Sequence, residues 1–194
     1  MRAARLLLVA PLLLLGVACS DEDADDTVIQ GATTTVAEGT TTTTTEAETT
    51  TTTAFEGATT PTSSPGTASG VALLTDVEVG DGVVTFTFRE GTPGFDVQYV
   101  EPPITQDGSG EEVQVAGDAH LSVRMEPASG VDLSGEEFEE TYTGPERIPG
   151  TGVIAEVVRT GDFEAVLSWV VGLDEERAYR VEADASMLRV YFSR

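Results

Sequence analysis

After residue 70 the chain consists of short runs in which apolar and polar residues alternate. In VVTFTFR (83–89), Val84, Phe86 and Phe88 fall on one face and the threonines on the other. This period of two is typical of a half-buried strand. A Gly-Asp-Gly sequence joins the run to LLTDVEV (73–79), as expected for a β-hairpin.

The same alternation recurs up to the last residues. It places Phe95, Val97 and Tyr99 on one face, then Leu121, Val123 and Met125, and finally Leu188, Val190 and Phe192. We count about nine short strands and no segment with a helical period, which predicts an all-β fold, an antiparallel β-sandwich.

Residues 152–172 are predicted to form two strands with a turn at Thr160, Gly161 and Asp162. This turn puts Phe163 and Ala165 on the same face as Leu167, Trp169 and Val171, and we expect Trp169 to lie in the core.

Residues 126–151 form a connection longer than most in a compact domain, so we expect it to be functional or to cover part of the core. Ser134 followed by Glu137, ahead of Phe138, is a capping-box pattern. It predicts one short helical turn near 135–141.

The N-terminal third has a different composition. Residues 27–67 hold 19 threonines, and Phe55 is the only aromatic residue between 19 and 70. Such a segment cannot bury enough apolar area to offset its conformational entropy. We therefore expect residues 19–70 to form a disordered acidic and Thr-rich linker ahead of a folded domain at 71–194.

Residues 1–18 resemble a secretory signal peptide, because Arg2 and Arg5 precede an apolar run that is too short to span a bilayer. GVAC at 16–19 resembles a bacterial lipobox, which predicts lipidation of Cys19 and anchoring to the membrane. The alternative is simple cleavage that leaves Cys19 as a free thiol or removes it. Since the chain has no second cysteine, an intramolecular disulfide is excluded.

Acidic residues outnumber basic ones by 34 to 10, and the formal net charge is −24. Residues 71–194 alone hold 25 acidic residues and 8 arginines, a formal charge of −17. No basic face can be assembled for a polyanion, so nucleic acid is excluded as a partner.

No catalytic motif was found. His120 is the only histidine and is expected to be exposed or half-exposed on a strand; one histidine cannot build a zinc site. Glu156 lies between Ile154 and Val158, where partial burial could raise its pKa, although an outward-facing carboxylate is the simpler interpretation. We predict a non-enzymatic protein without cofactor or metal.

Aromatic faces beside hydrogen-bonding groups are the usual means of binding glycans. Tyr142 in the long connection, and Tyr191 with Arg189 on the polar face of the last strand, are the candidate ligand contacts. Each of them could instead be a residue that packs locally at the rim of the sandwich.

Three phrases carry a family resemblance: GVALLTDVEVGDGVVTFTFREGTPGFDVQYV, then GSGEEVQVAGDAHLSVRMEPASGVDLSGEEFEETYTGP, then VIAEVVRTGDFEAVLSWVVGLDEERAYRV. Together they resemble the AMIN-like domain of envelope lipoproteins from GC-rich bacteria of the actinobacterial type. The resemblance implies a β-sandwich related to the AMIN domain, which targets proteins to the cell wall.

Two functions follow as expectations. The first is a lipid-anchored module on the outer face of the cytoplasmic membrane whose domain, in the cell-wall space, binds peptidoglycan or another wall polymer. The alternative is a protein-interaction module that partners an envelope enzyme or transporter.

Replacing Cys19 by Ser tests the anchor. We expect Cys19→Ser to release the protein to the medium or to leave it unprocessed, because the thiol that accepts the lipid is gone. Cell fractionation with intact-mass measurement distinguishes the two results. Unchanged membrane retention of a cleaved Cys19→Ser chain would contradict lipidation.

Overall fold

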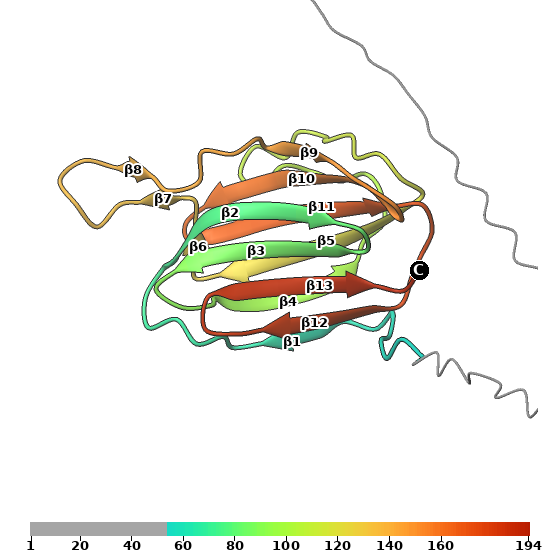
Figure 1. Ribbon diagram of the computed structural model, residues 1–194. Coiled ribbons are helices and arrows are strands. Elements are labelled where there is room, and N and C mark those ends of the chain that lie inside the picture. The colour runs from blue at the N-terminus through green and yellow to red at the C-terminus, as the bar shows by residue number, and fades with distance from the viewer. Residues whose placement is uncertain (1–53) are drawn as a thin grey trace, which may run out of the picture. The chain divides into compact units, whose positions relative to one another are not determined.

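Two β-sheets lie face to face, and a small hairpin projects from one end of them (Figure 1). The computed structural model describes residues 54–194, and every regular element among them is a strand. The predicted all-β sandwich is confirmed.

The larger sheet has six strands, in the spatial order β1 (Thr62–Ser64), β4 (Gly94–Tyr99), β5 (Ala119–Glu126), β11 (Val166–Leu173), β10 (Ile154–Phe163) and β9 (Arg147–Pro149). The smaller sheet has five, in the order β12 (Tyr179–Ala183), β13 (Met187–Phe192), β3 (Val83–Arg89), β2 (Ala72–Gly80) and β6 (Ala128–Ser129). The projecting hairpin pairs β7 (Val131–Asp132) with β8 (Glu139–Glu140). Within these sheets only β2 and β6 run parallel.

The core lies between the sheets and follows the predicted alternation. Val84, Phe86 and Phe88 of β3 are buried, as are the predicted inward residues of β5 and β13. Trp169 of β11 is fully buried, as expected, and meets Phe86 of the opposite sheet edge to face, with 6.0 Å between the ring centroids. This pair joins the two layers near the middle of the core.

The predicted turn at 160–162 was wrong. Strand β10 continues to Phe163, and the chain reverses at Glu164 and Ala165, whose φ values of 52° and 59° are left-handed. A bulge between Arg159 and Gly161 shifts the register by one residue. Consequently Leu167, Trp169 and Val171 face the core as predicted, whereas Phe163 is exposed.

The predicted helical turn near 135–141 is also absent from the described residues. Val131 pairs with Glu140 and Asp132 with Glu139, so this segment forms the β7–β8 hairpin. The capping-box pattern failed because no apolar face follows Ser134: Leu133 and Phe138 both remain exposed.

Order begins before the predicted boundary at residue 71. Strand β1 lies in the segment expected to be disordered, and its Thr62 and Ser64 pair with Val97 and Phe95 of β4. The hydroxyl of Tyr179 lies 2.7 Å from the carbonyl oxygen of Thr60, which fixes the same segment to the other sheet. β1 has no apolar face of its own, and it is ordered because β4 provides a partner strand.

A truncation tests the role of β1. We expect a chain that begins at residue 71 to have a free energy of unfolding about 1 to 3 kcal/mol lower than a chain that begins at residue 54, because it loses the β1–β4 hydrogen bonds. Urea denaturation of both chains measures the difference. The chain beginning at residue 54 should match the full-length protein; equal stability of the two truncations would contradict a structural role for β1.

Candidate functional site

Arg189 and Tyr191 lie on the surface of the five-stranded sheet, which we call the outer sheet face. They alternate along β13 with the buried Leu188 and Val190, and both are half-buried. The guanidinium of Arg180, from the neighbouring β12, lies 5.0 Å from the centroid of the Tyr191 ring. The structure therefore brings Tyr191 together with two arginines.

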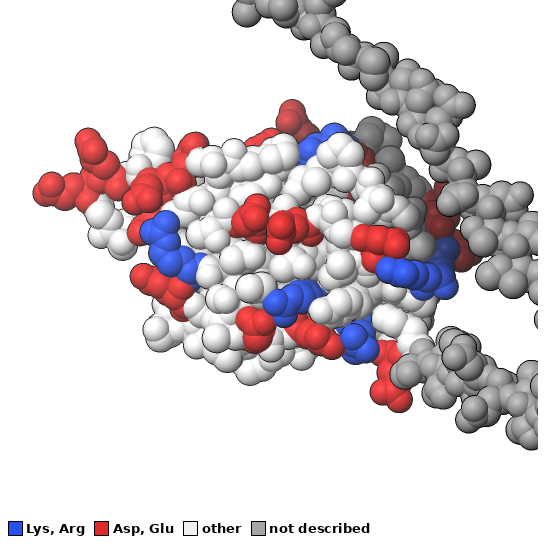
Figure 2. Space-filling model, viewed as in Figure 1, with Lys and Arg blue, Asp and Glu red and all other residues white. Residues whose placement is uncertain are grey.

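Carboxylates balance the arginines of the outer sheet face. Arg189 donates to Asp184 at 2.8 Å, and Arg180 pairs with Glu182 at 3.0 Å. The hydrogen bond to Asp184 raises the pKa of Arg189, and burial opposes that shift only in part. Figure 2 shows positive and negative side chains interspersed over β3, β12 and β13.

Tyr142, the third predicted contact, lies elsewhere. Its ring is buried and meets Trp169 edge to face, with 5.6 Å between the centroids. Its hydroxyl donates to the carbonyl oxygen of Pro145 at 2.8 Å. Burial raises the pKa of Tyr142, and the nearby Arg159 only partly counters this. Tyr142 is thus a packing residue, and no contact joins it to Tyr191.

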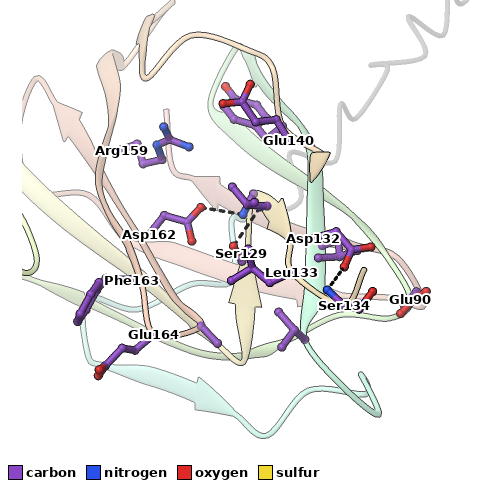
Figure 3. A pocket seen from close by; sticks show the side chains of 16 residues that line it. Glu90, Ser129, Asp132, Leu133, Ser134, Glu140, Arg159, Asp162, Phe163 and Glu164 are labelled. Atoms are coloured by element: carbon purple, nitrogen blue, oxygen red, sulfur yellow. Dashed lines mark hydrogen bonds between the residues drawn. The ribbon is translucent and has the colours of Figure 1, made fainter. Parts of the chain in front are cut away.

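Tyr142 forms part of the wall of a cavity of about 940 Å³, which we call the hairpin groove (Figure 3). Residues of β10 and the following turn lie on one side of it, and residues of the β7–β8 hairpin on the other. Its lining residues are Val71, Leu73, Glu90, Ser129, Gly130, Val131, Asp132, Leu133, Ser134, Glu140, Tyr142, Arg159, Asp162, Phe163, Glu164 and Ala165.

The strand register explains how the groove arises. Arg159 lies opposite Trp169, and Asp162 lies opposite Leu167. Residues that face each other in an antiparallel pair point to the same side of the sheet. Arg159 and Asp162 therefore continue the core-facing side of the large sheet, at the end where the edge strand of the smaller sheet, β6, is only two residues long.

Hydrogen bonds shape the two sides of the hairpin groove. Asp162 accepts from the backbone N–H of Gly130 at 2.8 Å, and Asp132 accepts from the backbone N–H of Ser134 at 2.8 Å. The hydrogen bonds from Ser134 lower the pKa of Asp132. Arg159 is the only cationic residue in the lining, and it pairs with Glu146. The rim is thus predominantly anionic.

Large apolar side chains are exposed in and beside the groove. Leu133 is 75% exposed, and Phe163 is 58% exposed. Phe138, on the connection between β7 and β8, is 72% exposed. None of these three residues was predicted to be an exposed contact. The signal for two of them was that Leu133 and Phe138 are isolated apolar residues in an acidic stretch.

Comparison with protein families matches residues 72–191 to the AMIN-like domain, which is more than half of the chain. The chain belongs to this family. AMIN-like domains are generally associated with binding to peptidoglycan and the cell envelope, and the domain suggests an envelope location. Comparisons with curated proteins and with solved structures gave no significant match.

Cys19, the predicted lipidation site, lies outside the described residues, as do the predicted signal peptide and most of the predicted linker. Between residues 54 and 194 there is no helix long and apolar enough to cross a bilayer. The same part of the chain holds no group of three or more His, Cys, Asp or Glu side chains that could bind a metal ion.

His120 is buried in the AMIN-like domain, contrary to the prediction of an exposed or half-exposed residue. It does face away from the core, but residues 113–117 cross over that side of the sheet. The Nε2 atom of His120 donates to the carbonyl oxygen of Val115 at 3.1 Å. Gly172 allows this close approach, because a Cβ atom there would lie 1.8 Å from the carbonyl oxygen of Ala116.

Glu156 holds the other side of the same crossing segment. Its carboxylate accepts from the backbone N–H of Ala116 and from Arg147, and its side chain is 13% exposed. Burial acts to raise the pKa of Glu156, but the hydrogen bonds from Arg147 and Ala116 outweigh it and lower the pKa. An ionised carboxylate that accepts two hydrogen bonds is a structural group and a poor proton donor.

The lowered pKa of Glu156 predicts a pH-dependent stability. Its contribution is fully present above the unfolded-state pKa of about 4.3 and is lost as the pH falls through the lower folded-state value. We expect Glu156→Gln to lower the free energy of unfolding by about 1 to 2 kcal/mol at neutral pH, and by less below about pH 4. Urea denaturation across this pH range measures the difference.

Glu111→Gln provides the matched control. Glu111 is exposed and lies in the connection between β4 and β5, which also contains the segment 113–117 that Glu156 binds. We expect it to leave the free energy of unfolding unchanged at each pH. A Glu156→Gln deficit that stays constant between neutral and acidic pH would contradict the lowered pKa.

Proposed function

We propose that the protein is a non-catalytic, lipid-anchored envelope protein whose AMIN-like domain binds a wall polymer of the peptidoglycan type. Lipidation of Cys19 would hold it at the outer face of the cytoplasmic membrane, with the domain in the cell-wall space. The family's general association with peptidoglycan and envelope binding supports this proposal.

The observation that carries the proposed site is the grouping of Tyr191 with Arg180 and Arg189 on the outer sheet face. A flat sheet surface suits a long polymer, and a partly exposed tyrosine offers an apolar ring on which a sugar can pack. Arginine fits carboxylates of the polymer through its fork of N–H donors.

Charge favours this face over the rest of the domain. Wall polymers are often anionic, and residues 71–194 carry a formal charge of −17. Around Tyr191 on the outer sheet face, Arg180 pairs with Glu182 and Arg189 with Asp184, so these charges balance one another. An anionic polymer meets less repulsion there than at the acidic β7–β8 hairpin.

The proposed non-catalytic role is supported by the hydrogen bonds of the polar side chains in the described residues. His120 and Glu156 both bind backbone atoms of the segment 113–117, so neither is available to a substrate. Since no nucleophile with an adjacent base occurs among the hydrogen bonds of residues 54–194, the domain is best described as a binding module.

Variants of the outer sheet face test the proposal. We expect Tyr191→Ala and Arg189→Gln each to weaken binding of the full chain to purified insoluble cell wall about tenfold, because each removes a contact surface or a charge-assisted hydrogen bond. Co-sedimentation at low and moderate salt measures the affinity. Urea denaturation of the same variants checks that they remain folded.

Arg124→Gln is the matched control, since Arg124 lies on the outward side of β5 in the other sheet and pairs with Glu126 at 2.7 Å. It should sediment with the wall as the unmodified chain does. If the unmodified chain does not sediment at either salt concentration, the proposed function is wrong. If Tyr191→Ala and Arg189→Gln sediment normally, the assignment of the site is wrong.

A further inference from the structure

The hairpin groove is separate from the outer sheet face, and wall binding leaves it unexplained. Five large hydrophobic side chains are exposed in the described part of the chain: Phe55, Val71, Leu133, Phe138 and Phe163. Three of them line the groove, and a fourth, Phe138, lies on the hairpin that borders it. An apolar cluster of this kind marks an interaction site.

We propose that the hairpin groove binds a cationic, amphipathic polypeptide segment of another envelope protein. The groove has a volume of about 940 Å³, which is large enough to hold several side chains of a partner. Leu133 and Phe163 are the exposed anchors of the groove, and apolar side chains of a partner cover them better than the hydroxyl-rich surface of a glycan does.

The charge of the partner follows from the rim. Glu90, Asp132, Glu140, Asp162 and Glu164 line the groove, and the single lining cation, Arg159, is already paired with Glu146.

The hairpin itself adds Glu136, Glu137 and Glu139. Only Glu139 has a basic neighbour, Arg89, at 3.9 Å. Figure 2 shows that acidic side chains dominate this projecting end of the molecule. Lysine or arginine residues that flank an apolar anchor would meet carboxylates on both sides of the groove.

The same charges argue against two other occupants. A second copy of this chain would bring its own acidic surface against the acidic rim, and like charges at close range are unfavourable. A membrane surface carries anionic lipids, which the carboxylates around Leu133 and Phe138 would repel.

Peptide binding to the full chain tests the proposal. The probe is a synthetic peptide of alternating lysine and leucine, labelled for fluorescence anisotropy. Two peptides of equal length are compared with it: one in which serine replaces leucine, and one in which glutamate replaces lysine. We expect both replacements to weaken binding at least about tenfold, and higher salt to weaken the lysine-leucine complex.

Groove variants locate the binding. Leu133→Ser and Phe163→Ser should each weaken binding of the lysine-leucine peptide about tenfold without unfolding the domain, since both side chains are exposed. The double variant Glu136→Gln with Glu137→Gln should reduce the salt dependence of binding. Phe55→Ser is the matched control, because Phe55 is an exposed phenylalanine outside the groove, and it should bind the peptide normally.

Several results would overturn the proposal. Equal binding of the lysine-serine and lysine-leucine peptides would show only non-specific attraction to an acidic protein. Normal peptide binding by Leu133→Ser and Phe163→Ser would place the site elsewhere. If the unmodified chain dimerises, or binds anionic vesicles, and Phe163→Ser abolishes that binding, then a second copy or a membrane is the occupant. None of these results bears on wall binding, which uses the outer sheet face.

Discussion

The fold and the groove both depend on the packing around Trp169. Its indole meets Phe86 of the opposite sheet on one side and Tyr142 of the long connection on another, at 6.0 and 5.6 Å between ring centroids. The Nε1 atom of Trp169 is buried without a hydrogen-bond partner. By holding Tyr142, this packing fixes the connection that carries the β7–β8 hairpin.

The two exposed surfaces differ because their charges are arranged differently. On the outer sheet face, Arg180 and Arg189 each have a carboxylate partner within 3.0 Å, so the charges cancel locally. On the hairpin, Glu136 and Glu137 have no cation beside them among the described ion pairs. The proposed wall-binding surface would therefore repel an anionic polymer little, and the proposed groove would attract a cationic partner. The two proposals do not conflict, because they use surfaces of different charge.

The strands were predictable wherever one face of a run is buried and the other is not, as in β3 and β13, because burial imposes a period of two. The groove was not predictable, since it depends on two features that alternation cannot reveal. The bulge between Arg159 and Gly161 shifts the register by one residue, and the turn at Glu164 and Ala165 uses left-handed residues without glycine. A pattern of period two assigned Phe163 to the core, whereas the bulge leaves it exposed. His120 was similarly misplaced, because residues 113–117, which lead into β5, fold back over its side of the sheet.

The acidic residues around the groove oppose the self-association that exposed apolar residues favour. Leu133, Phe138 and Phe163 would favour self-association in a neutral protein, because two copies could bury them against each other. A formal net charge of −24 opposes that encounter over distances up to the Debye length, about 8 Å at physiological salt. A cationic partner is attracted by the same field that keeps copies of the chain apart. One set of carboxylates would thus both attract the proposed partner and oppose self-association, and neutralising them would weaken both effects together.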